Sequence, residues 1–297
     1  MPNTPKPQTV LPLDTPDTRN VEKPQRRESK HRANDLDGGS WTRNSVSIWP
    51  DIRKTSEEWQ FKHPAMFPVA LVTRLIQCFT TEEDRVIMDP FAGVGSTLIA
   101  AEALGKDGIG IEISPEFAEK ARTRSITDNM LAPSREVRKG KRILYCADAN
   151  ALLDYVKANC IDFVVTSPPY WDILLQKRTA DYKETRHYGD EVADLGKISD
   201  YTVFLKALQN VFGMVYEVLK PGKYCCVVVM DLRKKDRFYP FHMDVCNFMQ
   251  ELGFVFDDII IWDRRHEYNN LRPLGYPHKF RINKVHEYIL IFQKPRQ

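Results

Sequence analysis

Two hydrophobic periods alternate along residues 66–294. Short apolar runs of roughly four to eight residues are typical of buried β-strands, and longer segments with apolar residues at helical spacing are typical of amphipathic helices. The pattern predicts strands at 85–90, 108–113, 142–148, 161–167, 223–231, 254–262 and 286–294, and helices at 66–80, 96–105, 114–125, 201–220 and 242–253. Strands and helices therefore alternate over most of the chain.

Residues that end or begin helices support these boundaries. Gly105 is placed to close the helix at 96–105. Ser114 and Pro115 stand where an N-cap and a first helical residue are expected. Pro221-Gly222 is expected to end the helix at 201–220, because proline cannot continue a helix.

The alternation indicates an α/β fold with a doubly wound, mostly parallel sheet. The last two strands, at 254–262 and 286–294, are joined by about two dozen polar and basic residues without a helix. We expect this pair to be antiparallel, because parallel neighbours usually need a helical crossover.

Composition narrows the choice of protein class. The chain has 297 residues, of which 42% are hydrophobic, enough for one sizeable α/β core. Residues 1–40 are polar and proline-rich and are expected to form a disordered tail. A single catalytic domain is expected over residues 41–297. Its first apolar anchors are Trp41, Val46, Ile48 and Trp49.

Charge and special residues exclude further classes. The net charge of +3 permits a nucleic-acid partner without requiring one. No apolar run approaches the ~20 residues of a membrane span, and the N-terminus lacks the apolar core of a signal peptide. The six cysteines show no C-x-x-C spacing for a zinc site. We therefore expect a cytoplasmic protein with no metal centre.

The strongest local motif is DPFAGVGST at residues 89–97, between a predicted strand and a predicted helix. Open α/β sheets bind ligands at such junctions, and Gly93 and Gly95 let the backbone approach a ligand. Glu112 ends the next strand, where a carboxylate can accept both hydroxyls of a ribose. Asp148 ends the third strand and is a candidate contact for an adenine amino group.

Other interpretations of the glycine-rich motif fit less well. A P-loop needs a lysine before the hydroxyl residue, and Gly95-Ser96-Thr97 has none. A dinucleotide loop needs a third small residue where Leu98 stands, and Asp89 would repel a pyrophosphate. Taken alone, this motif also fits a tight turn that binds no ligand.

A second motif follows the strand at 161–167, which runs into Ser167-Pro168-Pro169-Tyr170-Trp171. The two prolines stiffen the turn and remove two backbone donors, which leaves carbonyl groups as acceptors. Acceptors for N–H groups, beside aromatic faces that hold an extruded base, suit methylation of a base amino group. A proline-rich turn with core aromatics is the alternative for this motif taken alone.

With these motifs in order, the chain resembles the amino-group DNA methyltransferases, the N4-cytosine and N6-adenine class, over roughly residues 60–294. DPFAGVGST looks like the cofactor loop of the family, and TSPPY at 166–170 looks like its catalytic tetrad with a preceding threonine. Residues 63–68 resemble the segment that helps to hold the methionine part of the cofactor. Further segments similar to the family are 231–233, 238–240 and 286–288.

The resemblance implies S-adenosylmethionine as cofactor and a Rossmann-like methyltransferase fold, a seven-stranded sheet with a reversed C-terminal hairpin. It implies as catalytic residues Ser167, Pro168, Pro169 and Tyr170. It implies as cofactor-binding residues His63, Pro64, Phe67, Asp89, Phe91, Ala92, Gly93, Gly95, Ser96, Thr97, Glu112, Asp148 and Ser167.

Ser167 bears on the target base. The family usually has serine at this position in N4-cytosine enzymes and Asp or Asn in N6-adenine enzymes, so the resemblance favours cytosine N4. Adenine N6 in DNA, or an RNA base, is the alternative within the same chemistry. A non-catalytic DNA-binding module is a third hypothesis, which the presence of Asp89, Gly93 and residues 167–170 disfavours. Cytosine C5 methylation is set aside because the chain has no Pro-Cys dipeptide.

The expected partner is therefore duplex DNA with a flipped-out target base, and a cognate restriction endonuclease is a candidate second partner. No large insert for reading DNA sequence is visible. Two basic segments, 172–200 and 263–284, are the candidate DNA-contacting loops, because lysine and arginine neutralise phosphates. The candidate side chains are Lys177, Arg178, Arg264, Arg265, Arg272 and Lys279.

Overall fold

A computed structural model describes residues 32–61, 66–124, 139–172, 194–268, 271 and 273–296. Residues 33–297 form one compact unit. Its helices are α1 (Gly38–Asn44), α2 (Ser56–Gln60), α3 (Val69–Phe79), α4 (Ser96–Ala103), α5 (Pro115–Thr123), α6 (Leu152–Tyr155), α7 (Tyr201–Val218) and α8 (Phe241–Glu251), with short 3-10 turns η2 (Ala149–Ala151), η4 (Leu195–Lys197) and η5 (Arg265–Glu267). Its strands are β1 (Ile48–Trp49), β2 (Val86–Asp89), β3 (Asp107–Glu112), β4 (Arg142–Cys146), β5 (Ile161–Thr166), β6 (Leu219–Val229), β7 (Leu232–Lys234), β8 (Arg237–Tyr239), β9 (Val255–Asp263) and β10 (His286–Gln293).

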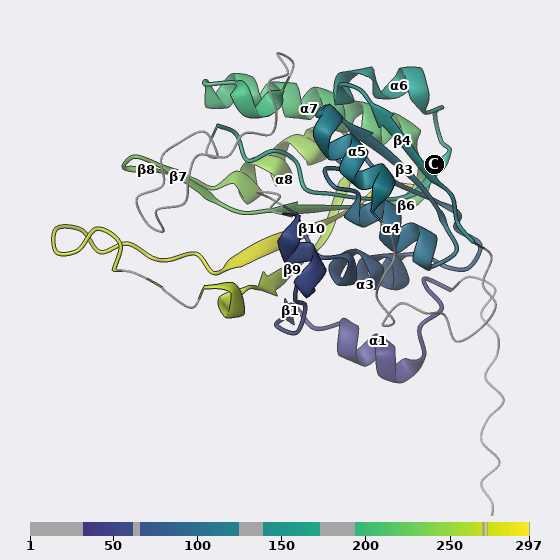
Figure 1. Ribbon diagram of the computed structural model, residues 1–297, viewed down its shortest axis with the longest axis horizontal. Helices are drawn as coiled ribbons and strands as arrows, with labels where there is room; N and C mark the ends of the chain where they lie inside the picture. Colours follow the sequence, from purple (N-terminus) through teal and green to yellow (C-terminus); the bar gives the residue numbers. More distant parts are fainter. Residues whose placement is uncertain are drawn as a thin grey trace, which may run out of the picture. The chain divides into compact units, whose positions relative to one another are not determined.

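The main sheet has eight strands in the order β1-β9-β10-β6-β5-β2-β3-β4 (Figure 1). β10 runs antiparallel to both β9 and β6, and the other neighbours pair in parallel. The α/β class, the mostly parallel sheet and the reversed C-terminal hairpin are thus confirmed. The eighth strand, β1, was not predicted. It has two residues, too few to show a hydrophobic period.

The order of strands reverses between β2 and β5. From β2 the chain continues to β3 and β4 on one side, whereas β5 leads to β6, β10 and β9 on the other. Ligands of open α/β sheets bind outside the carboxyl ends of the strands at such a switch point. Asp89 and Thr166 end these two strands, so the two sequence motifs begin side by side.

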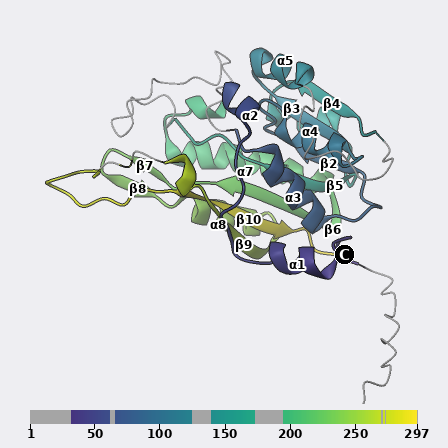
Figure 2. The same ribbon diagram turned by 60° about the horizontal axis from the view of Figure 1, so that its bottom comes forward.

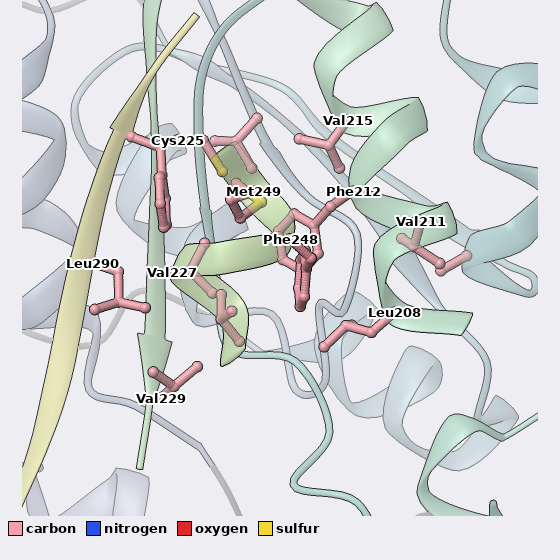
Figure 3. Close-up of a cluster of buried hydrophobic side chains, with 14 of the residues drawn as sticks. Leu208, Val211, Phe212, Val215, Cys225, Val227, Val229, Phe248, Met249 and Leu290 are labelled. Carbon is pink, nitrogen blue, oxygen red and sulfur yellow. The ribbon is translucent and has the colours of Figure 1, made fainter. Parts of the chain in front are cut away.

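Helices pack on both faces of the sheet (Figure 1, Figure 2). Val227 and Val229 of β6 belong to the cluster with α7 and α8, whereas Val228 belongs to the cluster with α3 and α4. This alternation is the two-residue period of a strand that is buried on both faces. Figure 3 shows the first cluster, in which the rings of Phe212 and Phe248 are 5.8 Å apart. The long apolar run of β6 thus follows from its central position.

The junction between α7 and β6 differs from the prediction. α7 ends at Val218 and β6 begins directly at Leu219, so Pro221-Gly222 lies inside the strand and does not end the helix. Gly222 adopts a positive φ of 78° in this part of the strand, where the register with β5 shifts. Its N–H donates to the carbonyl oxygen of Lys294 at 2.8 Å, which keeps this end of the strand paired.

The segment before β1 also differs from the prediction. Only Trp49 of the four expected anchors is buried. The others are between 46% and 53% exposed: Trp41, Val46 and Ile48. The compact unit starts at Ala33, and the buried amide of Asn34 donates to the carbonyl oxygen of Cys78 at 2.8 Å. Residues 1–31 of the expected disordered tail lie outside the described part of the chain. Residues 32–40 are described, and α1 begins among them at Gly38. None of the helices described in the structure is long and apolar enough to span a membrane.

Gly110 controls how closely the loop after β2 approaches β3. A Cβ atom at this position would lie 2.8 Å from the Cβ atom of Ala92 and 3.0 Å from a methyl group of Leu144. We expect Gly110→Ala to lower the free energy of unfolding by about 1–3 kcal/mol through overpacking, measured by urea denaturation. Gly38→Ala is the matched control, because nothing lies within 4 Å of its Cβ position. Equal effects of the two substitutions would contradict the close packing at Gly110.

Candidate active site

A cavity opens at the carboxyl ends of β2, β3, β4 and β5. This is the edge where the sequence motifs were expected to meet. The described residues that line it are Met66, Phe67, Pro90, Phe91, Ala92, Gly93, Val94, Ser96, Ile111, Glu112, Ile113, Ala147, Asp148, Ala149, Ser167, Pro169, Asp194 and Leu195. Both the glycine-rich loop and the Ser-Pro-Pro-Tyr turn therefore border one cavity.

The loop between β2 and α4 takes its shape from two glycines. Gly93 and Gly95 have φ values of 52° and 78°, a region that other residues rarely adopt. A Cβ atom on Gly95 would also lie 2.9 Å from the Cβ atom of Ala121 in α5. Ser96 starts α4, and its hydroxyl donates to the carbonyl oxygen of Phe67 at 2.9 Å. The loop is thus held against the segments on either side of it.

Asp89 lies behind the cavity and joins the two motifs. Its Oδ1 accepts from the Thr166 hydroxyl at 2.6 Å and from the Phe91 amide at 3.0 Å, and its Oδ2 accepts from the Thr97 hydroxyl at 2.7 Å. Burial raises the pKa of this carboxyl to about 6, while the three donors favour its ionised form. The carboxyl group is satisfied inside the protein, so it supports the loop and does not line the cavity.

Glu112 ends β3 and faces the cavity. Its Oε2 accepts from the Gly93 amide at 2.7 Å and its Oε1 from the Ser114 amide at 2.8 Å. Burial raises its pKa to about 7, against these two donors. Each carboxylate oxygen has a further lone pair, so both can accept a hydroxyl hydrogen from a ligand. The geometry fits the two hydroxyls of a ribose.

The cavity is acidic. Asp148 and Asp194 line it together with Glu112, and no lysine or arginine occurs among its described lining residues. Such a lining repels a pyrophosphate and attracts a ligand that carries positive charge and hydroxyl donors. Ile113 and Leu195 add apolar surface for a flat base. The lining therefore fits S-adenosylmethionine, with its sulfonium, amino and ribose groups, and disfavours a dinucleotide.

The Ser-Pro-Pro-Tyr turn carries a directed chain of hydrogen bonds. The Tyr170 hydroxyl donates to Oε2 of Glu287 at 3.2 Å and lies 3.1 Å from the Ser167 hydroxyl oxygen. Glu287 accepts in turn from the guanidinium of Arg264. Because Tyr170 gives its single hydrogen to Glu287, it receives the hydrogen of Ser167. The lone pairs of Ser167 then serve as acceptors at the cavity.

The aromatic rings of the turn are covered by the protein. Tyr170 is 6% and Trp171 is 3% exposed. The Trp171 ring packs edge-on against Tyr201 and Tyr239, at 5.0 Å each, and the ammonium group of Lys234 lies 3.8 Å from its centre. The prediction that these rings offer open faces for stacking on a base is therefore wrong. They anchor the turn from behind, with Trp171 at a φ of 53°.

Most of the candidate cofactor-binding and catalytic residues come together. Those that line the cavity are Phe67, Phe91, Ala92, Gly93, Ser96, Glu112, Asp148, Ser167 and Pro169, and those outside its lining are Asp89, Gly95, Thr97, Pro168 and Tyr170. His63 and Pro64 fall outside the described residues. Asp194 and Leu195 were missed, since Asp194 shows only the signal of an N-cap, accepting from the Gly196 amide at 2.8 Å.

The candidate DNA-contacting residues divide into two groups. Arg264 is an internal residue: its side chain is 15% exposed and pairs with both Glu267 and Glu287. The interpretation of Arg264 as a phosphate contact is therefore wrong. Arg265 and Lys279 are exposed, with side chains 75% and 56% accessible. The remaining candidates lie outside the described residues: Lys177, Arg178 and Arg272.

The sheet, its switch point and the acidic cavity beside a Ser-Pro-Pro-Tyr turn define an α/β protein of the Rossmann-like methyltransferase class. A family model described as DNA methylase, of the N6 and N4 type, matches residues 3–123 and 161–297. The chain therefore belongs to this DNA methylase family. S-adenosylmethionine, the methyl donor of the family, agrees with the lining of the cavity.

Individual relatives match over shorter stretches. The type II methyltransferase M2.DpnII of Streptococcus pneumoniae is 39% identical over 28% of this chain and 31% of its own length. The type II methyltransferase M.MthZI of Methanothermobacter thermautotrophicus is 30% identical over 51% of this chain and 44% of its own. The chain thus spans less than half of either relative. A Thermus thermophilus protein solved with S-adenosyl-L-methionine is 29% identical, with a TM-score of 0.37, over 51% of this chain and 54% of that one.

The pKa of Glu112 predicts how cofactor affinity depends on pH. Ribose hydroxyls would donate to the ionised carboxylate, so binding would displace a proton at any pH below about 7. We expect the affinity for S-adenosylmethionine, measured by calorimetry, to fall up to about tenfold from pH 7 to pH 6. The stability of the protein without ligand depends on pH in the opposite direction. Because the pKa of Glu112 is higher in the folded than in the unfolded protein, the free energy of unfolding falls as the pH rises from 4.5 to about 7.

The control is Glu112→Gln, which cannot ionise. Its affinity should be lower than that of the wild type at pH 8 and should change less between pH 6 and pH 8. An identical pH dependence in both proteins would remove Glu112 from the cofactor site.

Proposed function

We propose that the chain is a site-specific DNA methyltransferase that moves a methyl group from S-adenosylmethionine to an exocyclic amino nitrogen of a flipped-out base, cytosine N4 in the first place. One observation carries the proposal. Ser167, at the start of the catalytic turn, borders the same cavity as Glu112, the expected ribose ligand. Cofactor and amino group would therefore meet at the carboxyl edge of β5.

The cofactor would be held by three kinds of contact. Glu112 would accept the ribose hydroxyls, Asp148 would accept from the adenine amino group, and Ile113 and Leu195 would contact the adenine ring, since all four line the cavity. The bound cofactor supplies an electrophilic methyl group on a positively charged sulfur. Gly93 lets the backbone come close to it. Asp89 acts as a positioning residue, because it holds the loop without lining the cavity.

The target amino group would be held by Ser167 and by the carbonyl oxygen of Pro168. Both accept an N–H hydrogen, which directs the nitrogen lone pair toward the methyl group and places negative partial charge where the nitrogen becomes positive. Such preorganised electrostatic contacts are often worth about 3–4 kcal/mol each. Tyr170 and Glu287 are positioning residues here, because they take the hydrogen of Ser167 away from the cavity.

Serine at the head of the turn favours cytosine N4, since the family usually has Asp or Asn in its N6-adenine members. Adenine N6 in DNA is the second candidate. The DNA backbone would contact exposed cations at the same edge, among them Arg265 and Lys279. The curated relatives are type II methyltransferases, so a restriction endonuclease with the same recognition site is a candidate partner.

The product on DNA tests the function. We expect cells that express the chain to accumulate 4-methylcytosine in their DNA, detected by mass spectrometry of the nucleosides. Cells that express Ser167→Ala serve as the background control. A signal of 6-methyladenine would move the target to adenine. Neither modified base, in cells that contain folded protein, would refute methylation of DNA.

The hydrogen-bond chain predicts graded losses of rate. Ser167→Ala should slow single-turnover methyl transfer by about 100-fold or more, the cost of one preorganised contact. Tyr170→Phe should cause a smaller loss, because it removes the acceptor for the Ser167 hydrogen and keeps the ring. Tyr155→Phe, on α6 and 42% exposed, removes the same hydroxyl elsewhere and should leave the rate unchanged. A Ser167→Ala rate equal to that of the wild type would place the chemistry elsewhere.

A further inference from the structure

The segment 273–285, here called the arm, extends away from the sheet between β9 and β10 (Figure 1). It carries large apolar side chains that almost nothing covers. Phe280 is 92%, Tyr276 is 79% and Ile282 is 68% exposed. Exposed apolar side chains that gather at one place commonly mark an interaction surface. The arm therefore has the character of a contact element.

The tip of the arm has a defined backbone. The amides of His278 and Lys279 both donate to the carbonyl oxygen of Gly275, at 2.9 and 2.8 Å. A Cβ atom on Gly275 would lie 2.2 Å from the carbonyl oxygen of Lys279, so the turn admits only glycine there. This tight turn leads directly into Phe280.

The arm contacts the β7–β8 hairpin through side chains, and the two project in the same direction in both views (Figure 1, Figure 2). Asp236, in the hairpin turn, pairs with Arg281 and lies 3.9 Å from the ammonium group of Lys279. The ammonium group of Lys284 lies 4.3 Å from the ring centre of Phe238. Hairpin and arm thus form one projection.

The root of this projection rests on the catalytic turn. Lys234 of β7 pairs with Asp172 at 2.5 Å and covers the Trp171 ring, and Tyr239 of β8 packs against the same ring. Trp171 directly follows Tyr170 in the Ser-Pro-Pro-Tyr turn. A macromolecule whose base enters the cavity at this turn would therefore run along the projection.

The projection concentrates the positive charge of the chain. Residues 232–239 and 273–285 contain seven lysines and arginines and one aspartate, whereas the whole chain has a net charge of +3. Such a density of cations with interleaved aromatic rings suits a phosphate backbone with stacked bases.

We propose that duplex DNA lies along this projection and that Phe280, beyond the catalytic turn, inserts its ring between base pairs that flank the target and so helps to open the duplex there. The inference rests on the proposed function. A flipped base costs its stacking and pairing, and apolar wedges in other DNA-binding proteins stabilise such opened steps. Among the described aromatic residues of the turn and the projection, Tyr170 and Trp171 are buried, whereas the ring of Phe280 is exposed and available to insert.

The test compares methyl transfer on two DNA duplexes. Both contain the recognition site, which is first identified by mapping methylated positions in genomic DNA. One duplex is fully paired, and the other has an abasic site opposite the target base, so that its target is already unpaired. Phe280→Ala should slow single-turnover transfer about tenfold or more on the paired duplex and much less on the abasic one. Phe280→Trp should restore the rate. Val203→Ala, an exposed apolar position on α7, is the control that should match the wild type.

Several results would overturn the wedge. An unchanged rate of Phe280→Ala on the paired duplex would show that Phe280 has no role in methyl transfer. An equal loss on both duplexes would show that Phe280 contacts DNA without helping to open it. Loss of binding to anionic phospholipid vesicles in Phe280→Ala, with transfer unchanged, would assign the arm to a membrane surface. If no methylated site can be mapped in genomic DNA from cells that contain the folded wild-type protein, the proposed function itself is refuted, which is a distinct outcome.

Discussion

The buried carboxyl group of Asp89 holds together the part of the molecule on which its chemistry depends. It accepts hydrogen bonds from Thr97 at the start of α4, from Phe91 in the loop and from Thr166 at the end of β5. Burial alone would favour its neutral form, and the donors compensate for the water that it has lost. The glycine-rich loop and the Ser-Pro-Pro-Tyr turn therefore have a fixed spacing across the switch point between β2 and β5.

The reversed direction of β10 has a second consequence for the site. Because β10 is antiparallel, its first residues reach the edge at which the parallel strands end. Glu287 therefore meets Tyr170, and Arg264 at the end of β9 neutralises Glu287. The C-terminal hairpin thus completes the sheet and also orients the hydrogen of Ser167. The connection between its two strands includes the arm, which contacts the β7–β8 hairpin through Arg281 and Asp236.

Long elements with many apolar residues at regular spacing were predictable from the sequence. The strand at 161–167 and the helix at 201–220 show complete hydrophobic periods, and both occur with small shifts at their ends. Short elements were not predictable. β7 and β8 have three residues each, so alternation has no room to appear. Pro221-Gly222 was assigned to a helix end because local propensity ignores the pairing of Gly222 with Lys294 across the sheet.

The sequence by itself determined the class of fold, the order of the motifs and the chemical types of the groups at the cavity, because periodicity and motif spacing are local properties. Only the tertiary structure decided which polar groups face the cavity and which are used inside the protein. Asp89 binds Thr166, 77 residues away, and Tyr170 binds Glu287, 117 residues away. A buried polar group takes its partner from whatever the fold brings near. For this reason Arg264 became an internal ion pair, and Asp194 joined the cavity without a sequence signal for it.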